Sequence, residues 1–164
     1  VSGAACGHRG RRRPQALSGA FHDGRRLHLR LSGGAAGITS TRALTGGQEE
    51  DPIVWGAIRD LTHPVLAGGG GLWRIALPRT GPAGDFEDLP WDQAGGVRWL
   101  ASTTPDPGVG SRAEALGGHV QRIRGTAEPA VHPLPAPLLA LHRRIKAALD
   151  PDGILNPGRM YAEF

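Results

Sequence analysis

Apolar and polar residues alternate in several short segments of the chain, the pattern of strands with one covered face. In residues 26–31 leucines alternate with arginine and histidine, and the extended segment 16–22 lies just before them. Asp23-Gly24 joins the two segments, and Asp-Gly in that position is a strong hairpin signal. Further strands are predicted at 72–77, at 89–101 as a hairpin turning at Gly95-Gly96, and at 119–124.

A helical period is clearest near the C-terminus, where residues 137–149 place their large aliphatic side chains on one stripe and Asp150-Pro151 ends the helix. Weaker helices are predicted at 35–45, after Asp51-Pro52, and at 111–116. Because these helices alternate with amphipathic strands, the predicted fold class is α+β. We expect an antiparallel sheet covered on one face by helices.

Length and composition indicate one domain of 164 residues, and 26 glycines and 14 prolines predict many short elements. The chain begins at Val1, so we interpret it as a fragment or an excised domain, with residues 1–15 as a flexible lead-in. No apolar segment approaches the ~18 residues of a membrane span. The single cysteine, Cys6, excludes an internal disulfide, and a cytoplasmic location is expected.

Charge is distributed unevenly along the chain, which has a formal net charge of +4. Asp23 is the sole acid among the first thirty residues, whereas acids concentrate between residues 48 and 92. Such asymmetry indicates a basic edge that meets nucleic acid or a neighbouring domain with an anionic cofactor. A basic binding module, for RNA or for subunit contact, is therefore the alternative to an enzyme. The few aromatic residues, with no exposed pair spaced for base stacking, argue against RNA.

Motifs that carry chemistry are sparse. No His/Cys cluster has metal-ligand spacing, so no metal site is predicted, and the nucleophile-elbow and dinucleotide glycine motifs are absent from the sequence. Arg98 and Arg124 lie on predicted strands, where they either grip a carboxylate or protect an edge strand by charge. His119 follows Gly117-Gly118, where its ring points either into a cleft or into solvent.

The C-terminal tail is the most informative segment. Asn156-Pro157-Gly158-Arg159 predicts a rigid turn that can aim an amide and a guanidinium at a planar polar ligand. With the preceding helix it resembles the C-terminal signature of FAD-linked oxidases of the vanillyl-alcohol-oxidase type. Other segments resemble the C-terminal domain of glycolate oxidase FAD-binding subunits, namely Cys6–Gly10, Leu17–Ala20, Leu29–Gly33, Leu72–Pro78, Gly96–Leu100 and Gly117–His119.

The resemblance implies a substrate-side domain of an enzyme that oxidises glycolate, or a related 2-hydroxy acid, to glyoxylate or its equivalent. Electrons pass to FAD, which is bound mainly by a domain outside these residues, so the chain alone is expected to be inactive. The resemblance also implies a complex with a second FAD subunit and an iron–sulfur subunit. Through that complex the chain is expected at the inner face of the cell membrane, without a transmembrane segment.

The resemblance also implies roles for individual residues. Asn156 and Arg159 are carried over beside the flavin edge. His119 is the candidate catalytic base, because imidazole titrates near neutral pH. The candidates for substrate binding are Arg98 and Arg124, for the carboxylate, and Trp73 and Trp99, as pocket walls.

Overall fold

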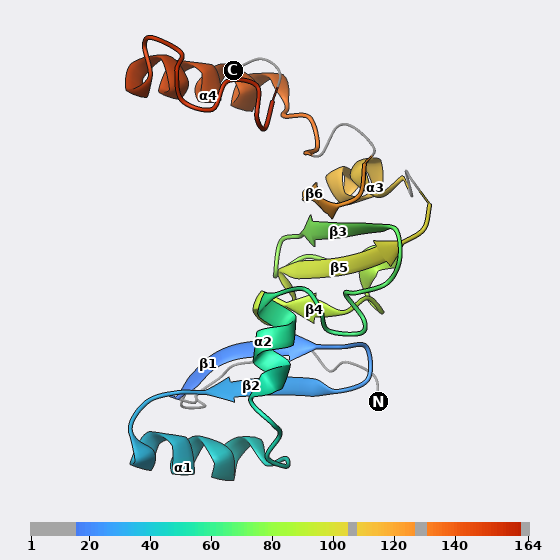
Figure 1. Cartoon of the computed structure of the whole chain (residues 1–164), viewed down its shortest axis with the longest axis vertical. Coiled ribbons are helices and arrows are strands. Elements are labelled where there is room, and N and C mark those ends of the chain that lie inside the picture. The colour runs from blue at the N-terminus through green and yellow to red at the C-terminus, as the bar shows by residue number, and fades with distance from the viewer. Residues whose placement is uncertain (1–15, 105–107, 127–130, 162–164) are drawn as a thin grey trace.

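A computed structural model describes residues 16–104, 108–126 and 131–161 of the chain. Six strands, four α-helices and two short 3-10 helices follow one another along these residues (Figure 1). The elements are β1 (Leu17–His22), β2 (Leu27–Leu31), α1 (Ala35–Thr45), α2 (Ile53–Arg59), β3 (Gly71–Ala76), η1 (Gly84–Phe86), β4 (Trp91–Asp92), η2 (Gln93–Gly95), β5 (Val97–Ser102), α3 (Val109–Ala115), β6 (His119–Arg124) and α4 (Ala136–Leu149). The expected lead-in at residues 1–15 lies outside the described residues.

The strands form one sheet in the order β2-β1-β4-β5-β3-β6, and every neighbouring pair is antiparallel. The two predicted hairpins, β1–β2 and β4–β5, are both confirmed. In the first, the Asp23 N–H donates to the Arg26 carbonyl at 3.1 Å, and Gly24 takes a φ of 94°. Glycine adopts this left-handed conformation without steric cost, which is why the turn forms there.

Two apolar clusters lie on opposite faces of the sheet, and β3 contributes to both. Trp73 and Ile75 pack with Phe86 of η1 and with Val109 and Ala113 of α3. Leu72, just before Trp73, packs on the other face, in a second cluster that includes Phe21 of β1 and Leu66, with Trp55 of α2 packed against it. Successive side chains of a strand point to opposite faces, so one strand serves two cores.

The helices are therefore divided between the two faces, α3 on one and α2 on the other. The predicted α+β class and the antiparallel sheet are confirmed. We expected helices on one face of the sheet, whereas the structure has a helix on each face. The segments predicted as helices are helical in the structure. Gly46 ends α1, and its N–H donates to the Arg42 carbonyl at 2.9 Å.

Helix α4 and the tail behind it extend away from the sheet (Figure 1). None of the residues of α4 is buried. Its aliphatic stripe, Leu138, Leu141, Ile145 and Leu149, is exposed, as are Ile154, Leu155 and Met160 of the tail. Whether residues 1–164 act as one domain thus stays a prediction. No described helix is long and apolar enough to cross a membrane.

The buried side chain of β2 is a histidine and not one of its leucines. His28 is 6% exposed, whereas Leu27 beside it is 51% exposed. The imidazole lies against the rings of Phe21 and His63, with centroids 6.1 and 5.9 Å away. Polar partners, described below, compensate for its burial.

The two-sided burial of β3 gives a stability prediction. Ile75 is fully buried, so Ile75→Ala leaves a cavity and should lower the free energy of unfolding by about 2–5 kcal/mol. Ile53, which is 74% exposed at the start of α2, is the matched control, and Ile53→Ala should stay within about 0.5 kcal/mol of the parent. Urea denaturation followed by circular dichroism measures both. Equal effects of the two substitutions would contradict the core assignment.

Candidate functional site

Arg98 lies on β5, on the face that carries Trp73 and Ile75. Its Nη1 donates to the Glu87 carbonyl at 3.1 Å, while its buried Nε has no hydrogen-bond partner in the structure. Burial lowers the pKa of this guanidinium, although the Glu87 charge opposes the shift. A half-buried arginine with an unused donor is chemically suited to bind a carboxylate.

Arg124 lies at the end of β6, and its guanidinium is engaged by the main chain. Its Nη2 donates to the Leu66 carbonyl at 2.5 Å and to the Gly68 carbonyl at 3.1 Å. It thus holds the start of the glycine run, Gly68–Gly71, against the sheet. In this structure Arg124 is a positioning residue for that loop.

The two candidate pocket tryptophans lie on opposite faces of the sheet. Trp73 pairs with Leu100 on β5, whereas Trp99 pairs with Arg74, one position out of phase. Trp73 is 8% exposed, and the guanidinium of Arg122 lies 5.5 Å from its ring centroid. Trp99 packs against the other cluster. The structure therefore does not bring them together as walls of one pocket.

His119 is exposed at the first position of β6, opposite Ala76 of β3. The preceding glycine is required there, because a Cβ on Gly118 would lie 2.4 Å from the Ala76 carbonyl oxygen. His119 shares its face with Trp99 and Arg74, and Arg98 lies on the opposite face. The candidate base and this candidate carboxylate ligand are thus separated by the sheet.

The tail is folded back on α4 by a set of polar contacts centred on Asp150. This carboxylate accepts from the N–H groups of Ile154 and Leu155 at 3.0 and 2.9 Å and pairs with Lys146 at 2.5 Å. The Lys146 ammonium also donates to the Leu155 carbonyl. The hydrogen bond from Lys146, followed by those from the main chain, lowers the pKa of Asp150.

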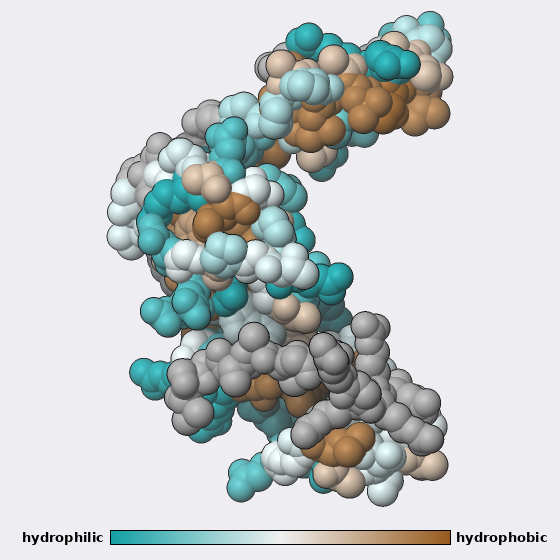
Figure 2. All heavy atoms as spheres, turned by 180° about the vertical axis from the view of Figure 1, so that it is seen from behind, coloured by the Kyte–Doolittle hydropathy of each residue, from teal (hydrophilic) through white to brown (hydrophobic). Residues whose placement is uncertain are grey.

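Asn156 and Arg159 lie together on this tail, with Arg159 Nη1 3.5 Å from Asn156 Oδ1. Asn156 takes a φ of 48° and Gly158 a φ of 65°, so the chain turns here through left-handed conformations. Both side chains are exposed, and exposed apolar residues of α4 and the tail surround them in the sequence. Figure 2 shows brown, apolar side chains gathered at the surface of the part formed by α4 and the tail. The exposed amide and guanidinium are chemically suited to hydrogen-bond a polar ligand.

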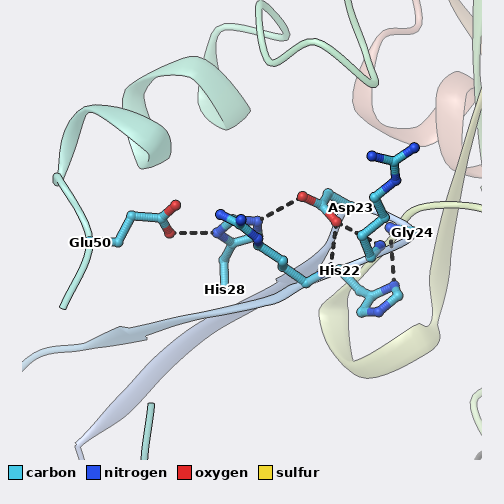
Figure 3. Close-up of polar contacts among 7 residues, drawn as sticks. His22, Asp23, Gly24, His28 and Glu50 are labelled. Atoms are coloured by element: carbon cyan, nitrogen blue, oxygen red, sulfur yellow. Dashed lines mark hydrogen bonds and ion pairs between the residues drawn. The ribbon is translucent and has the colours of Figure 1, made fainter. Parts of the chain in front are cut away.

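A polar cluster that sequence reasoning missed lies at the end of the β1–β2 hairpin. Glu50, His28 and Asp23 are aligned there (Figure 3), with Glu50 Oε2 2.7 Å from His28 Nδ1 and Asp23 Oδ2 3.2 Å from His28 Nε2. Asp23 Oδ1 accepts from the N–H groups of Arg25 and Arg26, each at 2.7 Å. The hairpin turn therefore fixes the carboxylate that faces His28.

These contacts shift the ionisation of both groups. Burial opposes the charged form of Asp23, but hydrogen bonds from Arg26, Arg25 and His28 outweigh it and lower the pKa of Asp23 to about 2. Burial likewise opposes protonation of His28, but hydrogen bonds to Glu50 and Asp23 prevail and raise the pKa of His28 above 6.5. The cluster thus concentrates negative charge around one imidazole.

His63 completes this cluster from the segment that follows α2. One ligand atom from each of Asp23, His28 and His63 lies within 4.8 Å of the others, the arrangement of a metal-binding group. His63 Nδ1 is buried and has no hydrogen-bond partner in the structure. In the sequence, a histidine among the alternating leucines of residues 27–31 was the one available sign of this cluster. Glu50 and His63, which lie beside His28, come from later segments of the chain.

His28 and Glu50 also line a cavity of about 980 Å³ bounded by β2, α1 and α2. Arg30, Arg42 and Arg59 line it too, as do Leu29 and Trp55. The cavity therefore joins apolar walls to arginine side chains beside the polar cluster. None of the candidate site residues predicted from the sequence lines it.

Known proteins are similar to this chain in two ways. Residues 134–160, which comprise α4 and most of the tail, match the family model of FAD linked oxidases, C-terminal domain. The resemblance seen in the sequence is confirmed, and the chain carries the C-terminal signature of FAD-linked oxidases.

The chain is also 38% identical over 155 residues to glycolate oxidase subunit GlcE of Escherichia coli (strain K12). The similar region comprises 92% of this chain and 43% of that protein, so the chain spans less than half of its relative's length. No solved structure matches the chain significantly.

The Asp150 contacts predict how the tail is held. Asp150→Asn weakens the ionic contact with Lys146, so hydrogen exchange in residues 151–160 should quicken while the melting temperature of the sheet stays unchanged. Asp152, exposed two positions later, is the matched control, and Asp152→Asn should leave exchange as it is. Unchanged exchange in the Asp150 variant would show that other contacts hold the tail.

The same contacts give a dependence on pH. The pKa of Asp150 is lowered from its ordinary value of 3.8, so its ionised form stabilises the docked tail above that value. As the pH falls from 3.8 through the lowered pKa, protonation removes this contribution and the tail should loosen. Hydrogen exchange of the Leu155 amide across this range measures the effect, and Asp150→Asn should abolish the dependence.

Proposed function

We propose that the chain is the substrate-side domain of a flavin-dependent oxidoreductase that converts glycolate, or a related 2-hydroxy acid, to the 2-oxo acid. FAD, when bound, accepts the hydride equivalent from the carbon that bears the hydroxyl group. The FAD is held mainly by a part of the enzyme outside these residues. The chain alone is therefore inactive.

The observation that carries this proposal is the similarity to glycolate oxidase subunit GlcE along nearly the whole chain. The structure adds physical support at the tail. An amphipathic helix with an exposed apolar stripe normally packs against other protein, and α4 has such a stripe over its whole length. We propose that the flavin-binding part of the enzyme covers it.

Within this chain, Asn156 and Arg159 are the residues that would hold the flavin edge, through an amide and a guanidinium. Arg98, with its unused buried Nε, is the better-supported ligand for the substrate carboxylate. Arg124 orders the glycine run instead of offering its guanidinium freely. His119 lies across the sheet from Arg98, so the two cannot contact one glycolate molecule. With Arg98 as the carboxylate ligand, no base is assigned within this chain. With His119 as the proton acceptor, a group on the face of Trp99 has to hold the carboxylate, and Trp73 lies on the other face.

We further propose that the chain works in a complex with a second FAD subunit and an iron–sulfur subunit, in the cytoplasm at the inner face of the cell membrane. Its relative is itself named as a subunit of glycolate oxidase. Pull-down from cells with a tag on the chain, followed by iron and flavin analysis, tests this assembly.

Reconstitution tests the enzymatic proposal. The chain alone should show no flavin absorbance and no oxidation of glycolate with an artificial electron acceptor. Expression together with the flavin-binding part of the same oxidase should give both. A yellow colour in the chain purified alone would mean that it binds flavin by itself, and the division of roles proposed here would be wrong.

In the reconstituted enzyme, Arg159→Ala should lower kcat/KM for glycolate roughly 10–100-fold, the effect of losing a hydrogen bond to a charged group. Arg143, exposed on α4, is the matched control, and Arg143→Ala should leave kcat/KM unchanged. The flavin content of each variant separates loss of cofactor from loss of turnover. Equal kcat/KM for both variants and the parent would remove Arg159 from the site.

A further inference from the structure

We propose that Asp23, His28 and His63 form a binding site for a first-row divalent metal ion of the zinc class. The three residues come from two elements of the fold, the β1–β2 hairpin and the segment after α2. The ion would join these elements beside the cavity bounded by β2, α1 and α2. This site is independent of the proposed flavin contacts on the tail.

The distances suit a small metal ion. A tetrahedral zinc site with bonds of about 2.1 Å has ligand atoms about 3.4 Å apart. His28 Nε2 and Asp23 Oδ2 are 3.2 Å apart, and His63 brings its ligand atom within 4.8 Å of both. The triangle is complete when the His63 ligand atom, now within 4.8 Å, comes to about 3.4 Å from the other two. Two imidazoles and a carboxylate suit zinc and neighbouring transition metals, and disfavour magnesium and calcium.

The surrounding hydrogen bonds hold the ligands in a binding orientation. Glu50 accepts a hydrogen bond at His28 Nδ1, which leaves Nε2 directed at Asp23. Without a metal, Nε2–H donates to the Asp23 carboxylate. A metal ion would replace that proton between Nε2 and Asp23 Oδ2. Glu50 thus acts as the outer carboxylate that metal-bound histidines commonly have.

Asp23 and His63 add two further observations. The backbone N–H groups of Arg25 and Arg26 occupy Asp23 Oδ1, so Oδ2 alone is left for the site. His63 Nδ1 is buried without a partner in the structure, and a buried polar atom of that kind calls for an unseen water or ion. Three protein ligands would leave one position of a tetrahedral ion open for water.

Titration with Co²⁺ and Zn²⁺ tests the site in the full chain. The parent and all variants carry Cys6→Ser, because Cys6 is the single thiol in the sequence and thiolates are ligands for these metals. Co²⁺ should give the intense visible absorption of a tetrahedral site at one ion per chain, and Zn²⁺ should displace it. Asp23→Asn, His28→Gln and His63→Ala should each abolish this spectrum.

Matched controls come from the same hairpin and loop. His22 stacks on Trp91 at 5.5 Å instead of facing the cluster, so His22→Gln should bind Co²⁺ like the parent. Glu50→Ala should weaken binding about 10–100-fold through loss of the outer carboxylate. Glu49→Ala, which changes the neighbouring exposed acid, should not.

A gain of signal guards against variants that merely unfold. His63→Cys replaces one ligand by another, so this variant should still bind Co²⁺ and should gain a thiolate-to-cobalt charge-transfer band in the near ultraviolet. The band arises only if residue 63 contacts the ion. A parent chain that binds Co²⁺ no better than His28→Gln, or a His63→Cys variant without the band, would overturn the proposal and leave His28 as an imidazolium between two carboxylates.

Discussion

The burial of β3 on both faces is the constraint on which the rest of the fold depends. Leu72 points into one cluster, while Trp73 and Ile75 point into the other, so neither core forms without this strand. Pairing of β3 with β5 on one side and β6 on the other satisfies its main-chain groups at the same time. The placement of α2 and α3 on opposite faces follows from these two cores.

Local patterns were enough to predict most elements of the sheet and its helices. The alternation of leucines around Asp23-Gly24 and the Gly95-Gly96 turn specify both hairpins, because the hairpin signal is contained in a few adjacent residues. The division of helices between two faces was not predictable in this way. Alternation along β3 shows that the strand has two faces. It does not show which helix packs on which face, because that depends on contacts between distant segments.

The candidate site shows the same limit more sharply. The tail turn could be predicted, because Asn156-Pro157-Gly158-Arg159 constrains its own backbone. Arg124 was predicted to bind a substrate, but its guanidinium bonds to carbonyls 56 and 58 residues earlier in the chain, a contact that no spacing rule reveals. The cluster of Asp23, His28 and His63 was not predicted for the same reason, because only tertiary folding brings His63 to the hairpin.

The anchoring of the glycine run by Arg124 has a consequence for the order of folding. Gly68–Gly71 has no side chains with which to fix its own conformation, and glycine loses more backbone entropy on ordering than other residues. The hairpin β4–β5 closes over a short loop, whereas the Arg124 contact closes a loop of more than fifty residues. We therefore expect this connection to become ordered late, after β6 has joined the sheet, and to open first when the edge strand frays.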